Sequence, residues 1–149
     1  MLKIPLVPYK FKIPNKLITK TFYLQILNKD MLHIDYHIIK SNANHLLKTF
    51  DKDPKWPENI SFQDNLNDLI LHGQQFAERT AFAFSIIDIN THEYLGCIYI
   101  YPTENKDYDC EIYYWVTLKE FNKGFKKKLL VIKNWIKKDW PFKNILYKN

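Results

Sequence analysis

Residues 113–130 read YYWVTLKEFNKGFKKKLL and join an aromatic, strand-like segment to a lysine-rich helical one. Apolar residues recur every three or four positions with lysines between them, which predicts an amphipathic helix over 118–136. Pro141 ends this pattern, because proline has no backbone N–H with which to continue a helix. The segment 143–149, KNILYKN, can supply one more strand. Parallel pairing of that strand with the strand before the helix would form a right-handed β-α-β crossover.

Three strand-like segments lie upstream of the helix: Ala81–Ile89, Tyr94–Tyr101 and Tyr108–Thr117. The connections between them are short and rich in turn residues, so neighbouring strands are expected to pair antiparallel as a β-meander. Together with the crossover they predict an α/β (α+β) fold. Its sheet would be mixed, mainly antiparallel and flanked by helices, with one parallel β-α-β crossover at the C-terminus.

The N-terminal part of the chain starts with an extended lead-in, residues 1–16, which contains three prolines. Alternating apolar residues predict a strand over 17–27. Helical spacing with a polar break predicts one bent helix or two short ones within 31–50, and the proline-containing segment 51–59 is expected to be a loop.

A further helical region begins at Ser61, where Asp64 stands at the right spacing for a capping box. It is expected to end near Arg79. The apolar residues on its predicted buried face are Phe62, Leu66, Leu69, Ile70 and Phe76.

Length and composition indicate a single folded domain over 1–149, since the chain has 149 residues, 46% of them hydrophobic and 16% aromatic. Cys97 and Cys110 stand in apolar segments without metal-ligand spacing, so we expect buried thiols in a reducing cytoplasm. No signal-peptide pattern and no run of 18 apolar residues is found in the sequence, which predicts no membrane association.

The excess of positive over negative charge lies in the C-terminal fifth of the chain. Residues 119–149 hold ten lysines against Glu120 and Asp139, whereas residues 1–118 carry slightly more acidic than basic groups. A basic block attracts phosphate-bearing partners such as a nucleic acid, an anionic membrane or a phosphorylated cofactor. Arg79 is the single arginine, which argues against sequence-specific DNA recognition.

The order of these elements and the junction at 113–130 resemble the GNAT superfamily of acyl-CoA-dependent N-acetyltransferases. In that family a Tyr-Trp-Val-like strand end is followed by the signature Q/R-x-x-G-x-G/A, which opens the helix that holds the CoA pyrophosphate. Tyr114, Trp115 and Val116 are similar to the strand end. Residues 121–126, Phe-Asn-Lys-Gly-Phe-Lys, stand where the signature belongs, and they keep its central glycine.

The resemblance implies acetyl-CoA as co-substrate, with two groups of binding residues. Tyr114, Trp115 and Val116 would offer backbone groups to the pantetheine arm. The pyrophosphate would meet Asn122, Lys123, Gly124, Phe125 and Lys126.

The atypical signature leaves two readings open for Lys126. A helix N-terminus attracts a diphosphate through its unpaired N–H groups, provided that small residues keep the approach clear. Lys126, with Lys123 and Lys127, would swing outward and pair with phosphate oxygens. Alternatively, the Lys126 side chain occupies the site, and CoA binding is weak or lost.

Glu111 is the candidate catalytic residue. It lies two residues before Tyr113 and four before Trp115, so strand alternation places the three side chains on one face. The resemblance implies that Glu111 would be the general base, which takes the proton from the amine that attacks the thioester. The tyrosine that protonates the leaving thiolate in the family lies on a helix beyond residue 149, so the chain looks C-terminally shortened.

No metal is expected. His33 and His37 are four residues apart, as two ligands on a helix would be, but no third ligand accompanies them.

Three functions therefore compete. The first is transfer of an acetyl group to a small-molecule or peptide amine by direct attack. The second is a non-catalytic GNAT-fold remnant or interaction module with a basic surface, and the third is a nucleic-acid or anionic-surface binder. The last strand would leave an unpaired sheet edge, which predicts a homodimer through the C-terminal edge strand.

Overall fold

The structure is a computed structural model and describes residues 4–47, 49–50 and 54–149. The strands are β1 (Lys16–Ile18), β2 (Phe22–Ile26), β3 (Phe82–Asp88), β4 (Tyr94–Tyr101), β5 (Cys110–Val116) and β6 (Ile145–Tyr147). The helices are η1 (Lys29–Met31), α1 (Leu32–Ser41), α2 (Ala43–Leu46), α3 (Phe62–Glu78), α4 (Leu118–Lys123) and α5 (Lys126–Asp139).

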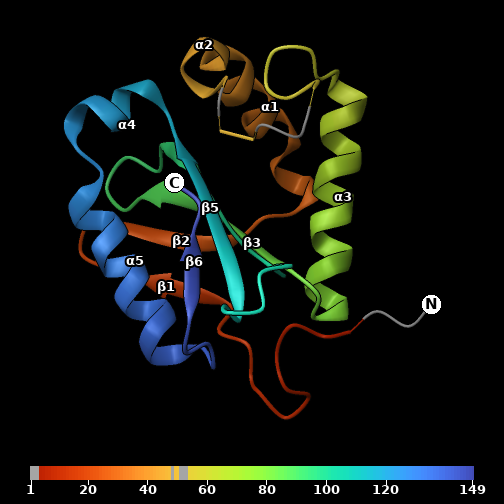
Figure 1. Cartoon of the computed structure of the whole chain (residues 1–149). Helices are drawn as coiled ribbons and strands as arrows, with labels where there is room; N and C mark the ends of the chain where they lie inside the picture. Colours follow the sequence, from red (N-terminus) through yellow and green to blue (C-terminus); the bar gives the residue numbers. More distant parts are fainter. Residues whose placement is uncertain (1–3, 48, 51–53) are drawn as a thin grey trace.

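The strands form one sheet in the order β1-β2-β3-β4-β5-β6. Every neighbouring pair is antiparallel except β5 and β6, which are parallel and are joined through α4 and α5. Helix α5 lies on one face of the sheet, and α1 and α3 lie on the other (Figure 1). The predicted mixed, mainly antiparallel sheet with one C-terminal crossover is confirmed.

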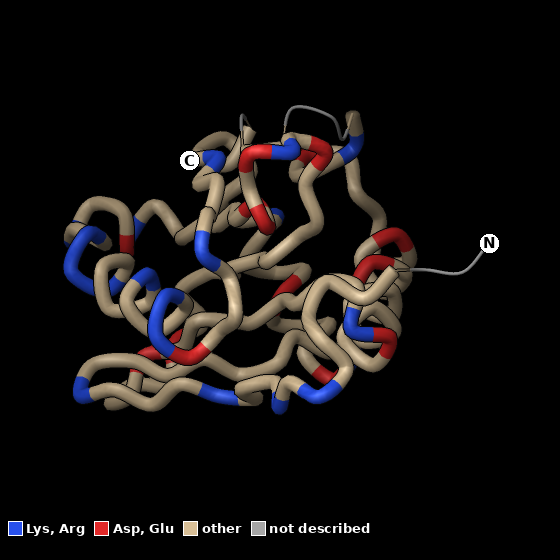
Figure 2. The backbone as a smooth tube through the Cα atoms, turned by 60° about the horizontal axis from the view of Figure 1, so that its bottom comes forward, with Lys and Arg blue, Asp and Glu red and all other residues tan. Residues whose placement is uncertain are grey.

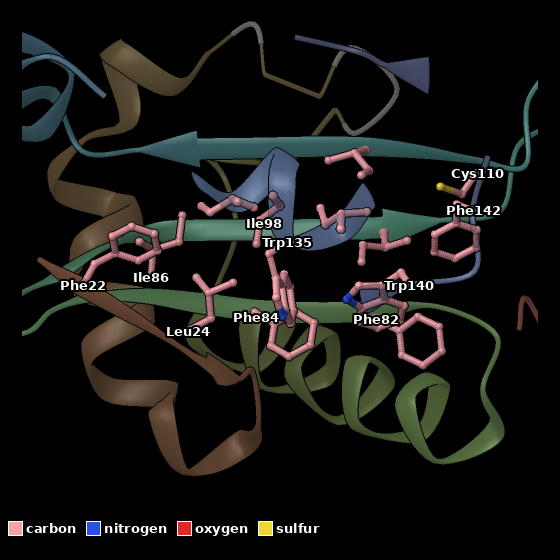
Figure 3. Packing of buried hydrophobic residues seen from close by; sticks show 14 of the residues in the cluster. Phe22, Leu24, Phe82, Phe84, Ile86, Ile98, Cys110, Trp135, Trp140 and Phe142 are labelled. Carbon is pink, nitrogen blue, oxygen red and sulfur yellow. The ribbon is translucent and has the colours of Figure 1, made fainter. Parts of the chain in front are cut away.

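Each face of the sheet carries its own apolar core. On the α5 face, Trp135 and Trp140 pack against the ring of Phe84, with ring centroids 5.6 and 6.3 Å apart (Figure 3). On the α1 and α3 face, Trp115 of β5 lies 6.2 Å from Trp56, centroid to centroid. The sheet is therefore held between two aromatic layers.

The predicted strand over 17–27 is wrong, because the chain turns back within it to form the hairpin of β1 and β2. The Thr19 hydroxyl accepts hydrogen bonds from the backbone N–H groups of Thr21 and Phe22, at 3.2 and 3.0 Å. It also donates to the Phe22 carbonyl at 2.8 Å. A side chain that hydrogen-bonds to nearby backbone competes with the extended ladder, and here it stabilises a turn.

The single helix predicted over 118–136 is also wrong, because it is divided into α4 and α5 at Gly124. The backbone there has φ +95°, a conformation that favours glycine. Apolar residues keep a helical spacing across Gly124, so the sequence pattern gives no sign of the break. Phe121, which would lie on the buried face of a continuous helix, is 60% exposed.

The capping box predicted at the start of α3 is confirmed, since Ser61 and Asp64 exchange side-chain and backbone hydrogen bonds of 2.9 Å. The predicted buried face of this helix is wrong in part. Phe62 and Ile70 are 41% and 38% exposed, whereas the polar Asn65 is buried. In the earlier segment 31–50 the structure has two short helices, which is one of the two alternatives predicted. Residues 51–53 of the predicted loop lie outside the described residues.

A buried polar cluster joins α1 and α3 to β4. The Asp35 carboxylate, 2% exposed, accepts hydrogen bonds from the Tyr94 hydroxyl and, at 2.9 Å, from the Asn65 amide. Cys97 adds a thiol contact at 3.8 Å. Burial raises the pKa of Asp35, although these hydrogen bonds act against the shift. Both cysteines are free and buried, as predicted for core thiols.

Replacing Asp35 by asparagine should change how stability depends on pH. A carboxyl group whose pKa is raised in the folded state stabilises fully below its unfolded pKa, close to 3.8, and this stabilisation is lost as pH rises through the folded pKa. As pH rises above about 4, the unfolding free energy should therefore shift in favour of Asp35→Asn, by about 1.4 kcal/mol for each unit by which the folded pKa exceeds the unfolded one. Urea unfolding of both proteins measures this difference, and a difference that does not vary with pH would contradict it.

Candidate functional site

Strands β5 and β6 pair over only part of the length of β5. The register pairs end at Ile112 with Tyr147, and the last backbone hydrogen bond runs from Lys148 N–H to the Ile112 carbonyl at 2.9 Å. Beyond it a side chain takes the place of the backbone ladder. The backbone N–H and C=O of Tyr114 bond to the carboxamide of Asn149, with N···O distances of 3.2 and 2.5 Å. An amide group therefore occupies the edge of β5 just beyond its backbone pairing with β6.

The three predicted strand-end residues do not face the same way. Backbone groups alternate between the two edges of a strand, so Val116 turns its N–H and C=O to the same edge as Tyr114. The Trp115 carbonyl instead faces β4, because a Cβ atom built on Gly96 would stand only 2.0 Å from it. The Trp115 side chain is buried, and its indole N–H donates to the Tyr99 hydroxyl at 2.8 Å. Tyr114 and Val116 thus share the open edge, and Trp115 does not.

The predicted pyrophosphate residues lie at the junction of α4 and α5. Asn122 and Lys123 belong to the last turn of α4, where backbone N–H groups pair within the helix. Gly124 forms the break, and Phe125 is the buried N-cap of α5, with its ring 5.4 Å from that of Tyr114. Phe125 has no polar side chain with which to cap α5. Because Lys126 is the first residue of α5, the N–H groups of its first turn have no partner within the helix, and the contact of Phe125 with Tyr114 places this helix end near β5.

Basic residues gather along α4 and α5 (Figure 2). The lysines among them differ in exposure and in ion pairing. Lys123, Lys126 and Lys127 are exposed and can reach an anion at the helix end. Lys128 is only 20% exposed in its side chain and forms an ion pair with Glu120, whose side chain is 3% exposed. Lys128 therefore neutralises a buried carboxylate of α4.

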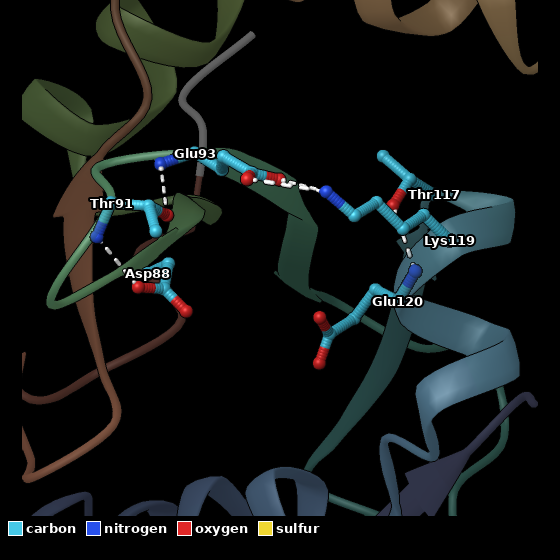
Figure 4. A network of polar contacts seen from close by, with 6 residues as sticks. All are labelled: Asp88, Thr91, Glu93, Thr117, Lys119 and Glu120. Carbon is cyan, nitrogen blue, oxygen red and sulfur yellow. Dashed lines mark hydrogen bonds and ion pairs between the residues drawn. The ribbon is translucent and has the colours of Figure 1, made fainter.

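The start of α4 is fixed by two further contacts (Figure 4). The Thr117 hydroxyl accepts a hydrogen bond from the Glu120 N–H at 3.2 Å, as an N-cap does. Lys119 forms an ion pair of 3.2 Å with Glu93, which stands just before β4. These contacts connect the start of α4 to the end of β5 and to the segment before β4.

Glu111 lies on the face of the sheet covered by α1 and α3. Its carboxylate accepts a hydrogen bond from the Tyr113 hydroxyl at 3.2 Å, and Tyr101 of β4 is its register partner. The ring of Tyr113 lies 5.8 Å from that of Tyr101. Glu111 thus stands in the part of β5 that pairs with β6, on the face opposite to α5.

Sequence reasoning missed Asn149 and the pair of Glu120 with Lys128. An eight-residue separation gives no contact signal in a continuous helix, where residues three or four apart are neighbours. Within residues 4–47, 49–50 and 54–149, no three His, Cys, Asp or Glu side chains form a group that could hold a metal ion. The helices in the same ranges include none that is both long and apolar enough to cross a bilayer.

Comparison with known proteins gives matches in structure but not in sequence. No protein-family model and no curated protein matches the chain. A ribosomal-protein-S5-alanine acetyltransferase from Vibrio fischeri superposes with a TM-score of 0.70 at 13% identity, over 89% of this chain and 72% of that one. The microcin C7 self-immunity acetyltransferase, solved with acetyl-CoA and AMP, gives 0.62 at 14% identity, over 78% and 63%.

A Vibrio cholerae protein named as a ribosomal-protein-serine acetyltransferase gives a TM-score of 0.62 at 14% identity, over 81% of this chain. The chain spans 65% of that protein's length.

Proposed function

We propose that this chain, which has the GNAT fold, is an acetyl-CoA-dependent N-acetyltransferase that acts on an amine by direct attack. The edge of β5 beyond its pairing with β6 carries the proposal, because the backbone N–H and C=O of Tyr114 bind an amide there, that of Asn149. The pantetheine arm of CoA contains two amides. The N-terminus of α5 lies beside this edge, as a bound pyrophosphate would require.

The chain offers a distinct group for each part of the cofactor. Tyr114 and Val116 would hydrogen-bond the pantetheine amides from the open edge. The first N–H groups of α5, at Lys126 and Lys127, would bind the pyrophosphate, and their exposed ammonium groups would add charge-assisted contacts. Lys123 would approach the same phosphates from α4. Of the two readings of Lys126, we propose the outward one, because its side chain is exposed.

Acetyl-CoA would supply the thioester carbon that an unprotonated amine attacks. The new C–N bond would form as the C–S bond breaks, and the amine would lose a proton. Glu111 would take that proton through a water molecule, and the hydroxyl of Tyr113 would hold its carboxylate in place. The leaving thiolate would take a proton from solvent.

Calorimetric titration with acetyl-CoA tests the proposal directly, and saturable binding is expected. Absence of binding at millimolar acetyl-CoA would favour the alternative, a non-catalytic GNAT-fold module with a basic surface. If that surface bound nucleic acid, affinity for the nucleic acid would fall steeply with salt.

Replacing Gly124 by glutamate should reduce acetyl-CoA affinity at least tenfold relative to Gly124→Ala. Both variants impose the same backbone strain at φ +95°, and a Cβ at this position meets no atom of the described residues within 4 Å. The comparison therefore isolates the effect of a carboxylate beside the pyrophosphate. Calorimetry measures it, and Lys137→Ala, farther along α5, should bind as the wild type does. Equal affinity of the two Gly124 variants would contradict the assigned position.

Replacing Asn149 by alanine should strengthen acetyl-CoA binding. The Asn149 carboxamide competes for the Tyr114 backbone, and its two solvent-exposed hydrogen bonds are together worth about 1 kcal/mol, which corresponds to about a fivefold gain in affinity. The exposed Asn144→Ala is the matched control and should leave affinity unchanged. A loss of affinity in Asn149→Ala would show that this side chain assists the cofactor instead of competing with it.

Three further statements remain predictions. The acceptor is a small-molecule or peptide amine, and the protein acts in the cytoplasm. Self-association would use the edge at β6, a strand of three half-buried residues.

A further inference from the structure

A cavity of about 370 Å³ lies on the face of the sheet covered by α3. It is bounded by Asp68 and His72 of α3, by Tyr99 and Tyr101 of β4, and by Phe50 and Trp56 from the segment between α2 and α3. This volume is at the lower end of the range for small-molecule sites, about 300–1,000 Å³. Its size therefore fits a compact organic ligand.

Aromatic rings form most of the cavity wall. Tyr99 and Tyr101 stack with centroids 5.6 Å apart and planes 18° apart, and the Phe50 ring meets that of Tyr99 edge-on at 5.5 Å. The face of an aromatic ring carries negative charge density that attracts an organic cation. The wall is thus suited to an apolar ligand that bears positive charge.

Two side chains of α3 add hydrogen-bond acceptors to the cavity wall. The Asp68 carboxylate lies close enough to Tyr101 to help raise the pKa of its hydroxyl, after the larger effect of burial. His72 follows one turn later, and its Nδ1 atom is buried without a hydrogen-bond partner among the described residues. Burial lowers the pKa of His72 to about 4, so the ring is neutral near pH 7 and can accept a hydrogen bond from an ammonium N–H.

The cavity adjoins the proposed transfer site. Tyr101 is the register partner of Glu111, and both Tyr101 and Phe50 contact the ring of Tyr113, at 5.8 and 5.4 Å. One layer of aromatic side chains therefore separates the cavity from the candidate base. The cavity and Glu111 thus lie on the same face of the sheet, on either side of this layer.

We propose that this cavity binds the acceptor as a small organic amine, with its ammonium group between the aromatic wall, Asp68 and the free Nδ1 of His72. The inference rests on the proposed function and adds the class of acceptor to it. It favours a small molecule over a peptide because of the cavity volume. The ammonium form is recognised here, and the acceptor must lose this proton and move past the aromatic layer before its free amine attacks the thioester.

Binding of 2-phenylethylamine, measured by calorimetry without acetyl-CoA, tests the inference. The neutral 2-phenylethanol has the same shape and should bind at least tenfold more weakly. Asp68→Asn should remove most of that difference, and His72→Phe should weaken amine binding several-fold. Asp107→Asn, at an exposed position in the β4–β5 loop, is the matched control and should bind as the wild type does. Thermal melting verifies that each variant is folded.

The outcomes separate this inference from the proposed function. Binding of acetyl-CoA without preference for the amine over the alcohol would overturn the inference and leave the proposed function standing. Amine binding that depends on Asp68, without acetyl-CoA binding, would support the cavity and overturn the transferase. Tighter binding of trialanine than of 2-phenylethylamine would overturn the small-molecule acceptor in favour of a peptide amino terminus.

Discussion

Lys128→Met is expected to lower the free energy of unfolding by roughly 3–5 kcal/mol, because it leaves a buried carboxylate without its cation. The Glu120 side chain is 3% exposed and pairs with Lys128 across the break between α4 and α5. Methionine fills a similar volume but cannot neutralise the charge. The loss should appear as a large decrease in the midpoint of urea unfolding.

Two controls make the prediction specific. Lys127→Met changes an exposed lysine at the neighbouring position and should alter stability by less than about 0.5 kcal/mol. The double variant Glu120→Met with Lys128→Met should recover most of the loss, because a buried ion pair replaced by apolar residues is often close to neutral in stability. If the single and double variants were equally destabilised, loss of packing and not an unpaired charge would be the cause.

The sequence predicts the β-meander well because its strands are long, apolar and separated by short polar turns. The predicted strand Tyr94–Tyr101 has the bounds of β4, and the other two differ by at most two residues at either end. The hairpin at Thr19 and the break at Gly124 were not predicted. At both places the spacing of apolar residues indicates a continuous strand or helix, but local backbone geometry and side-chain contacts interrupt it. A side-chain hydroxyl turns the first segment, and one unusual backbone angle interrupts the second.

Candidate site residues were predictable where one strand or one helix end defines them. The common face of Glu111 and Tyr113 follows from side-chain alternation. Alternation of the backbone groups could also have shown that the Trp115 carbonyl lies on the edge opposite to that of Tyr114. The contacts of Asn149 and the lone Nδ1 of His72 depend on packing between distant segments. No local pattern in the sequence carries that information.

Gly96→Ala is expected to destabilise the protein by about 3 kcal/mol or more, at or beyond the upper end of the usual cost of overpacking. A Cβ atom at this position would stand 2.0 Å from the Trp115 carbonyl oxygen and 2.8 Å from the Cα of Val116. Both are backbone atoms of β5, so the clash cannot be relieved by rotating a side chain. Strands β4 and β5 would have to separate, and the unfolding free energy measures the cost.

Gly73→Ala is the matched control, with the opposite sign expected. Gly73 lies inside α3, and a Cβ there meets no atom of the described residues within 4 Å, so alanine should stabilise the helix by about 0.5–1 kcal/mol. Gly96→Ala should also weaken acetyl-CoA binding where the variant is still folded, because the displaced segment carries Tyr114 and Val116. Tight acetyl-CoA binding by a strongly destabilised Gly96 variant would show that the β5 edge is not where the cofactor lies.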